Sequence, residues 1–304
     1  MIVALAGGVG GAKLADGLAA VLGRDLTVIV NTADDFRHLG LWVSPDLDTV
    51  MYTLAGIANP DTGWGIAGES WTFLEQLARL GGPGWFRLGD RDLATHVLRS
   101  ERLARGERLT EVTGTLCRQL GIAARVLPMC DAPLQTIVQT AEGPLAFQEY
   151  FVARRCEVPV TGFRFAGAEN AAPSTEVRAA LADPGLRAII VCPSNPFVSI
   201  DPILAVPGLP ELLRSSGVPI VAVSPIIGGA AVKGPAAKML RELGHDVSAS
   251  AVAAHYRGWL HGMVIDRADA AERSAIETMG LAVEVAPSLM RDRRDRVALA
   301  NACL

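Results

Sequence analysis

The sequence has no hydrophobic run long enough to cross a membrane. No apolar stretch reaches the roughly 20 residues that a spanning helix needs, and the first residues lack the basic region of a secretory signal. We therefore expect a cytoplasmic protein without a membrane partner. An excess of positive charge is also missing, since 28 Lys and Arg face 32 Asp and Glu without any basic run. This balance excludes the pattern of a nucleic-acid-binding protein.

Cysteine and histidine are scarce. The five cysteines are odd in number and widely spaced, and the five histidines show no spacing typical of zinc ligands. These patterns argue against a disulfide framework and a zinc site, so we expect reduced thiols in the core. No Ser-His-Asp or Cys-His arrangement stands out, which disfavours covalent catalysis. Hydrophobic residues are abundant, at 50% of the chain, and predict a sizeable core.

Short apolar runs of strand length alternate with stretches of helical period along the 304 residues. This alternation predicts a Rossmann-like, doubly wound α/β fold with a mostly parallel sheet. Between about 134 and 170 the pattern changes to that of a β-hairpin. We therefore predict one α/β domain over residues 1–304 that carries a β-rich insertion. The expected strands are 2–6, 26–30, 124–127, 188–192 and 218–223, and the expected helices include 49–57, 71–80, 93–105, 109–120, 232–243 and 249–260.

The first predicted strand runs into a loop with four glycines and one lysine, at residues 7–13. Glycine lets backbone N–H groups approach an anion, and the start of the following helix attracts negative charge. The loop does not end in the Gly-Lys-Ser/Thr of a Walker loop, and Lys13 stands where a dinucleotide loop has its third glycine. We favour phosphate binding by Gly8, Gly10, Gly11 and Lys13 over an ordinary tight turn.

Polar residues also follow the second predicted strand. Asn31, Thr32 and Asp35 could hold a base, a ribose or a substrate hydroxyl, or could form an Asx-type turn, and both interpretations remain open. Further along, Asp46 and Asp48 precede an apolar helix. A carboxylate there either caps the helix or holds Mg²⁺ against substrate phosphates, with Asp48 the preferred ligand and Asp46 the alternative.

Charged residues surround a glycine in the 87–96 segment, ahead of another predicted helix. Arg91 could bind a phosphate or stack on an aromatic ring system. His96 lies inside the helix, where we expect a structural role.

Two later loops follow buried strands. Ser194 and Asn195 lie in a loop that two prolines make rigid, as expected of a binding loop. Gly228, Gly229 and Lys233 repeat the glycine-lysine arrangement of the first loop. Two such loops at strand ends could enclose a diphosphate from both sides. Together these residues favour phosphoryl transfer by positioning and charge neutralisation.

Six motifs, spread over nearly the whole chain, occur in the order of a known family. They are residues 7–13, 31–35, 44–49, 88–96, 192–196 and 224–228. In this order they resemble the 2-phospho-L-lactate transferase family of deazaflavin coenzyme F-420 biosynthesis. The alternative is a non-catalytic, nucleotide-sugar-binding regulator of the gluconeogenesis-factor type. The 45–48 and 90–96 blocks favour the transferase.

The resemblance implies a Mg²⁺-dependent transfer of a phospholactyl or phosphoenolpyruvyl group from a guanosine diphosphate donor to the ribityl hydroxyl of 7,8-didemethyl-8-hydroxy-5-deazariboflavin, with release of GMP. Among the donors we favour the enolpyruvyl one. Asp48, Asp90 and Arg91 would contact the deazaflavin, and Asp48 would orient the hydroxyl or hold the metal. Lys13 would join Asp48 in catalysis. A homodimer is a further expectation from the family. The resemblance implies that the nucleotide is bound by Gly8, Gly10, Gly11, Lys13, Asn31, Thr32, Asp35, Ser194, Asn195, Gly228 and Gly229.

Overall fold

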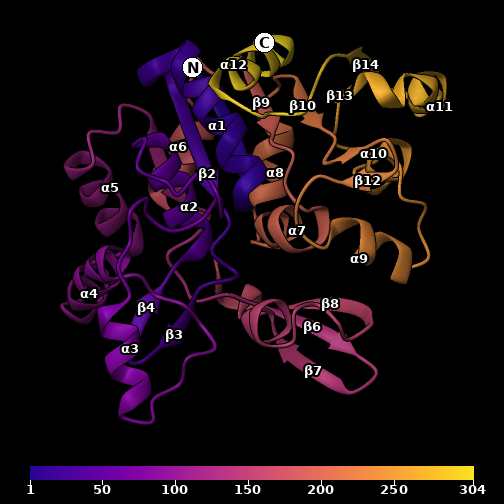
Figure 1. Cartoon of the computed structure of the whole chain (residues 1–304). Coiled ribbons are helices and arrows are strands. Elements are labelled where there is room, and N and C mark those ends of the chain that lie inside the picture. The colour runs from indigo at the N-terminus through magenta and orange to yellow at the C-terminus, as the bar shows by residue number, and fades with distance from the viewer.

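The structure is a computed structural model that describes all residues from Met1 to Leu304. Its centre is a seven-stranded sheet in the order β14-β13-β10-β9-β1-β2-β5 (Figure 1). Every pairing within this sheet is parallel. The predicted doubly wound α/β class is therefore confirmed. The strands are β1 (Ile2–Ala6), β2 (Leu26–Val30), β5 (Arg125–Pro128), β9 (Ala188–Val191), β10 (Ile220–Val223), β13 (Gly262–Ile265) and β14 (Ala282–Val285).

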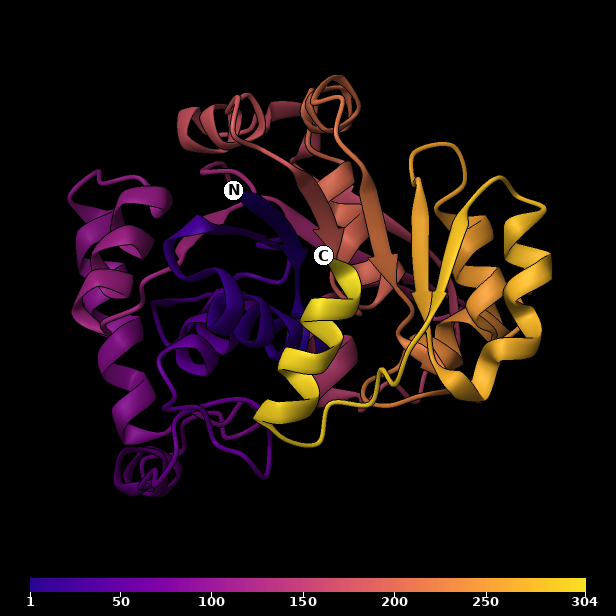
Figure 2. The same ribbon diagram turned by 90° about the horizontal axis from the view of Figure 1, so that it is seen from above.

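Helices cover both faces of the sheet, as Figures 1 and 2 show. Successive residues of a strand point to opposite faces, so Ile2, Ala4 and Ala6 of β1 join one hydrophobic core, and Val3 and Leu5 join the other. The first core is closed by α1 (Gly8–Leu22), α2 (Pro45–Leu54), α5 (Leu109–Gln119) and α12 (Arg293–Cys303). The second is closed by α6 (Thr175–Leu181), α7 (Asp201–Leu204), α8 (Leu209–Ser215), α9 (Ala236–Glu242), α10 (Ala249–His255) and α11 (Arg273–Glu277).

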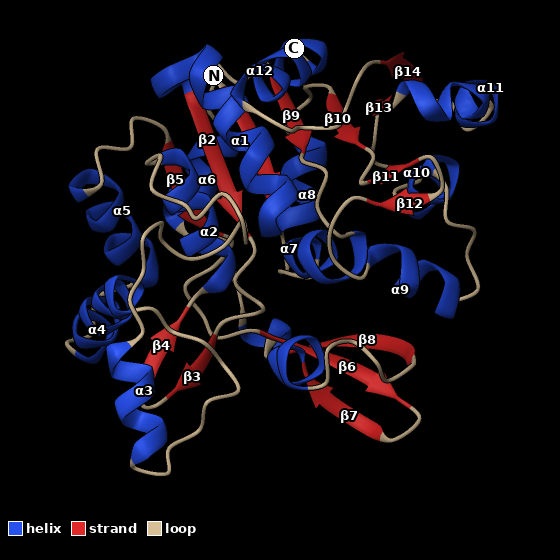
Figure 3. Ribbon diagram, in the orientation of Figure 1, coloured by secondary structure: helices blue, strands red, loops and turns tan.

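A small antiparallel sheet stands beside the central one (Figure 3). Its strands β6 (Gln135–Thr140), β7 (Gly143–Ala146) and β8 (Val160–Ala166) pair in the order β7-β6-β8. The predicted hairpin is confirmed, but its second strand, expected over residues 146–153, is Gly143–Ala146, and Glu149–Ala153 forms a π-helix instead. Val138, Tyr150 and Val160 belong to the same core cluster as one face of the central sheet. We call residues 135–166 the insertion.

Several other boundaries differ from the prediction. Helix α2 begins at Pro45 instead of residue 49, because proline is well suited to the first helical position. Helix α4 (Asp90–Ala104) begins three residues early, so Asp90 and Asp92 lie in its first turn. Strands β13 and β14 were not predicted, since β13 opens with a glycine and β14 has a glutamate between its two valines.

The remaining elements are short. Strands β3 (Phe36–His38) and β4 (Leu41–Val43) form one hairpin, and β11 (Ile226–Ile227) and β12 (Ala230–Ala231) form another. Helix α3 (Thr72–Arg79) lies ahead of α4. No single helix has both the length and the apolar composition of a membrane span. Pro196–Leu204 and Leu209–Ser215 reach them only together, as a pair bent by 82°.

Candidate active site

A cavity of about 780 Å³ opens at the carboxyl ends of the central strands. β2 and β5 extend the sheet on one side of β1, and β9 and its successors extend it on the other, so the strand order reverses between β1 and β9. In open α/β sheets, ligands bind in the crevice at this point. The cavity is lined by the glycine loop, the first turns of α2 and α4, the 85–87 loop, the insertion, and loops at 193–199, 224–236 and 288–290.

The glycine loop is anchored by two side chains from distant segments. Helix α1 begins at Gly8, directly after β1. The Ser194 hydroxyl donates to the Gly7 carbonyl oxygen at 2.8 Å and accepts from the Gly7 N–H at 3.1 Å. The Gly8 N–H donates to Asp46 Oδ1 at 2.8 Å. A protein carboxylate thus occupies the positive end of α1.

The glycines of this loop have different structural roles. A Cβ on Gly10 would clash with the Pro193 carbonyl oxygen, and one on Gly11 would lie 2.6 Å from Ser194 Oγ. These two glycines allow α1 to pack closely against the 193–194 loop. Gly8 has a φ of +62° and no atom within 4 Å of its Cβ position, so glycine is required there by the backbone conformation.

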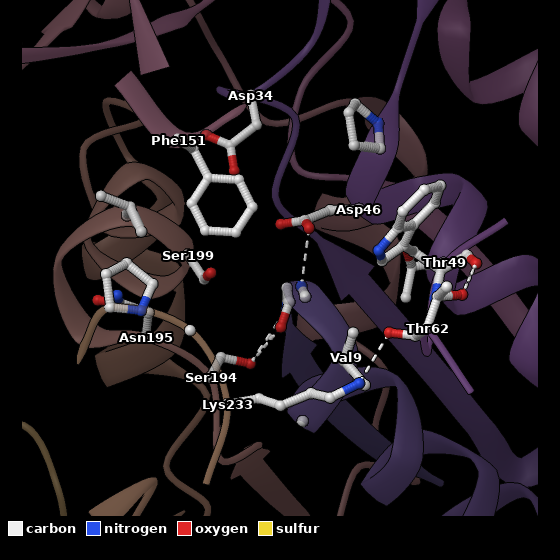
Figure 4. A pocket seen from close by; sticks show the side chains of 18 of the residues that line it. Val9, Asp34, Asp46, Thr49, Thr62, Phe151, Ser194, Asn195, Ser199 and Lys233 are labelled. Atoms are coloured by element: carbon white, nitrogen blue, oxygen red, sulfur yellow. Dashed lines mark hydrogen bonds between the residues drawn. The ribbon is translucent and has the colours of Figure 1, made fainter. Parts of the chain in front are cut away.

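Lys13 and Lys233 both line the cavity, and Figure 4 shows Lys233. Lys13 Nζ donates to the Met290 carbonyl oxygen at 3.0 Å, and Lys233 Nζ donates to the Thr62 carbonyl oxygen at 2.7 Å. Burial lowers the pKa of Lys13, and the positive charges of Arg296 and Lys233 lower it further. The mutual repulsion of the two amines favours an anion between them.

Two buried carboxylates, Asp34 and Asp46, also point into the cavity (Figure 4). Asp46 Oδ2 accepts from Asn31 Nδ2 at 3.0 Å, and Asn31 also donates to the Val198 carbonyl oxygen and accepts from the Ala33 N–H. Asp34 Oδ1 is buried without any partner. Burial raises the pKa of Asp46 to about 6 and raises the pKa of Asp34 well above its ordinary value, with the charge of Asp46 adding to the latter.

Asp48 belongs to a separate buried network. The fully buried Arg99 donates from Nη1 to Asp48 Oδ2 at 3.0 Å and from Nη2 to Asp48 Oδ1. His96 lies between two carboxylates, with Nδ1 3.6 Å from Asp48 and Nε2 3.2 Å from Asp92. The Tyr52 hydroxyl donates to Asp92 at 2.6 Å. Atoms of Asp48, Asp92 and His96 come within metal-binding range of one another, but Arg99 would compete with any cation for Asp48.

Aromatic side chains line the part of the cavity contributed by the 85–87 loop. Trp85 and Phe86 pack against the β3–β4 hairpin, with ring centroids 5.3 Å apart for His38 and Trp85 and 4.8 Å apart for Phe36 and Phe86. Trp85 remains 40% exposed and lines the cavity together with Phe86 and Tyr52. We call Trp85 and Phe86 the aromatic wall.

Residues 2–295 match the sequence profile of a family described as 2-phospho-L-lactate transferase CofD. The chain belongs to the CofD family. A phosphoenolpyruvate transferase from Kitasatospora aureofaciens is 43% identical over 311 residues, covering 100% of this chain and 96% of that protein. A 2-phospho-L-lactate transferase from Methanopyrus kandleri is 41% identical over 307 residues, with the same coverage of both chains. The predicted family is therefore confirmed, and the chain is a transferase of that family.

Among solved structures, a UPF0052-family protein from Bacillus halodurans has the same fold. It superposes with a TM-score of 0.67 over 99% of this chain and 97% of its own, at 15% sequence identity. The α/β architecture is thus found in a protein with little sequence similarity to this CofD-family chain.

The structure brings part of the predicted site to the cavity of this CofD-family chain. The predicted residues that line it are Gly8, Gly10, Lys13, Asp46, Asp48, Ser194, Asn195 and Lys233, and His96, expected to be structural, lines it as well. The predicted residues outside the lining are Gly11, Asn31, Thr32, Asp35, Asp90, Arg91, Gly228 and Gly229. Ligand roles for this second group stay predictions.

Most residues of the second group have structural contacts. Asp90 accepts from the Ser70 hydroxyl and from two backbone N–H groups at the start of α3, so it caps that helix. Arg91 Nη1 donates to the Ala67 carbonyl oxygen at 3.0 Å. Gly228 and Gly229 have φ values of +57° and +75° and form the two-residue turn between β11 and β12, a position that favours glycine.

Asp35 is also held by the protein. Its Oδ2 accepts from the Ser44 hydroxyl at 2.6 Å and from Trp42 Nε1 at 3.1 Å. Burial raises its pKa to about 8. Asp35 therefore connects the loop after β2 to residues 42–44, which directly precede the helix that carries Asp46 and Asp48.

Sequence reasoning missed Asp34, Asp92, Arg99 and the aromatic wall. A signal for two of them exists in α4, because Asp92, His96 and Arg99 are spaced by four and three residues and so share one helix face. All three are buried. Charged residues that share one buried helix face predict hydrogen-bonded ion pairs with a charged residue of a neighbouring element.

Proposed function

We propose that this CofD-family chain transfers a phosphoenolpyruvyl or phospholactyl group from a guanosine diphosphate donor to the ribityl hydroxyl of 7,8-didemethyl-8-hydroxy-5-deazariboflavin and releases GMP. The observation that carries the proposal is that one cavity at the sheet's switch point joins two lysines and a glycine loop to an aromatic wall and Asp48. Full-length relatives named for each of the two transfers, at 43% and 41% identity, support a catalytic role over a regulatory one.

The donor would bind on the side of the glycine loop. In the structure Lys13 and Lys233 donate to main-chain carbonyl oxygens. Each amine can exchange this neutral acceptor for a phosphate oxygen, because the charged acceptor forms a stronger hydrogen bond. Ser194 and Asn195 line the same region. The loops at 224–236 and 288–290 would then surround the nucleoside.

The acceptor would bind against the aromatic wall. A flat ring system stacks favourably on Trp85 or Phe86, and Asp48 lines the same cavity. Because Arg99 holds both oxygens of Asp48, the carboxylate is fixed in orientation. Its remaining lone pairs would accept a hydrogen bond from the attacking hydroxyl.

Asp34 and Asp46 fit a magnesium ion better than Asp48 does. Asp34 Oδ1 is buried without a partner, both side chains point into the cavity (Figure 4), and magnesium prefers one or two carboxylates together with substrate phosphates. Asp46, the alternative ligand in the sequence analysis, thus becomes the preferred one. Bound there, magnesium would neutralise charge on the phosphate oxygens of the donor.

In the proposed reaction the acceptor hydroxyl attacks the phosphorus distal to guanosine. A new P–O bond forms, the phosphoanhydride bond breaks, GMP leaves, and the hydroxyl proton is released to solvent. Asp48 orients the hydroxyl, while Lys13 and Lys233 offset the negative charge on the phosphate oxygens. No residue of the chain needs to form a covalent intermediate. We also propose a cytoplasmic homodimer, as the family suggests.

The test is an assay with purified protein, Mg²⁺, the deazaflavin and each donor in turn, read by mass spectrometry. The phosphoenolpyruvyl or phospholactyl derivative of the deazaflavin and an equal amount of GMP are expected with at least one donor. The donor that yields product identifies the transferred group. Tight binding of GDP without product from any donor would instead favour the regulatory function.

A further inference from the structure

Phe151 is a large aromatic side chain that stands in the cavity of the proposed active site. It is 39% exposed and lines the cavity. Its ring stacks on Phe147 with centroids 5.4 Å apart and planes at 13°. Figure 4 shows the ring beside Asp34, on the side that faces Asp46 and Ser199. The ring therefore lines the cavity together with the two carboxylates proposed to bind magnesium.

The insertion that carries Phe151 is attached at two borders of the cavity. Gln148 Nε2 donates to the main-chain carbonyl oxygen of Asp34 at 3.4 Å, at the end of β2. Lys238 of α9 donates to the Val158 carbonyl oxygen at 3.1 Å. Tyr150, next to Phe151, is fully buried. These contacts hold the backbone that carries Phe151 at the cavity.

The backbone around Phe151 has an uncommon conformation. Residues Glu149–Ala153 form a π-helix, an element that is rare and frequent at functional sites. Arg155 and Cys156 follow with φ values of +50° and +58°, which non-glycine residues seldom adopt. The short π-helix thus leaves the side chain of Tyr150 in the core and that of Phe151 in the cavity.

We propose that Phe151 keeps water away from the reacting phosphorus and so directs the donor to the acceptor hydroxyl. This inference rests on the proposed function. The competing reaction is hydrolysis, in which a water oxygen bonds to the distal phosphorus and the phosphoanhydride bond breaks. Its products are phosphoenolpyruvate or phospholactate, GMP and a proton released to solvent. An apolar ring next to buried carboxylates removes the space that this water needs.

The experiment compares the wild type with Phe151→Ala, Phe151→Leu and Phe165→Ala. Phe165 belongs to β8 of the same insertion and does not line the cavity, so its variant controls for loosening of the insertion. Each protein receives donor and Mg²⁺ with and without the deazaflavin. Free phosphoenolpyruvate or phospholactate and the transferred product are measured by mass spectrometry, and GDP affinity by titration calorimetry.

In Phe151→Ala, the ratio of hydrolysis to transfer should rise about tenfold, because water gains access to the reacting phosphorus. GDP affinity should stay the same, Phe151→Leu should show a smaller rise, and Phe165→Ala should match the wild type. An unchanged ratio in Phe151→Ala, or an equal rise in Phe165→Ala, would overturn the inference. So would a higher KM for the deazaflavin with unchanged hydrolysis, since that result indicates ring stacking. If the wild type converts no donor, the proposed function fails first and this inference with it.

Discussion

The ion pair between Asp48 and Arg99 leads to a prediction about the stability of the fold. Arg99 is fully buried and binds both oxygens of Asp48. Asp48→Asn removes the negative charge and leaves the buried guanidinium without its hydrogen-bonded counter-charge. Removal of one partner from a buried pair costs about 3–5 kcal/mol.

The expected shift in melting temperature follows from chain length. For 304 residues the entropy of unfolding is about 0.64 kcal/mol per kelvin. A loss of about 4 kcal/mol therefore lowers Tm by about 6 °C. Arg99→Met should lower Tm by a similar amount, because it leaves the Asp48 carboxylate unpaired. The double variant should lose much less than the two single losses combined, since no unpaired charge remains.

The assay is thermal unfolding followed by circular dichroism, with Asp16→Asn as the matched control. Asp16 pairs with Arg296 at 3.0 Å, but the two side chains are 12% and 23% exposed, so this pair should contribute less. Additive losses in Asp48→Asn and Arg99→Met, to within about 0.5 kcal/mol, would refute the reasoning. A Tm for Asp48→Asn equal to that of the wild type would do the same.

Three further predictions concern the other groups of the site. Lys13→Ala should weaken GDP binding about tenfold or more, because a charge-assisted hydrogen bond contributes about 1.5–3 kcal/mol, and an unchanged calorimetric titration would mean that Lys13 does not touch the nucleotide. Asp46→Asn should weaken Mn²⁺ binding, measured by electron paramagnetic resonance, whereas Asp90→Asn, which alters the cap of α3, should leave it unchanged. Burial raises the pKa of Asp35 to about 8. Between about pH 4 and pH 8 the unfolded chain therefore releases a proton that the folded chain keeps, so the stability of the fold decreases as pH rises. Asp35→Asn removes this effect, so its Tm relative to the wild type should increase from about pH 5 to about pH 8, and a constant difference would contradict the assignment.

The fold could be predicted from the sequence where elements are long or strongly apolar. The buried runs that became β1, β2, β9 and β10 were expected, and their order along the chain implies parallel pairing. Strand β13 escaped prediction because four residues beginning with Gly262 carry little periodic signal. The last helix, α12, escaped because its sequence is highly polar and only three of its residues are buried. Helix α12 packs against α1, and a contact between segments so far apart in the sequence leaves no local pattern from which the helix could be predicted.

The site was predictable in its location and not in the roles of its carboxylates. Strand-end motifs led to the glycine loop and Ser194, and the start of a predicted helix led to Asp46 and Asp48. The fold brings all of them to one cavity. The sequence could not tell which carboxylate has a counter-charge, because the partner of Asp48 lies 51 residues away in α4. Asp34 and Asp46 lack such a cation, and burial raises the pKa of both. An uncompensated pair of carboxylates destabilises a fold, so their presence at the switch point favours a positively charged ligand there.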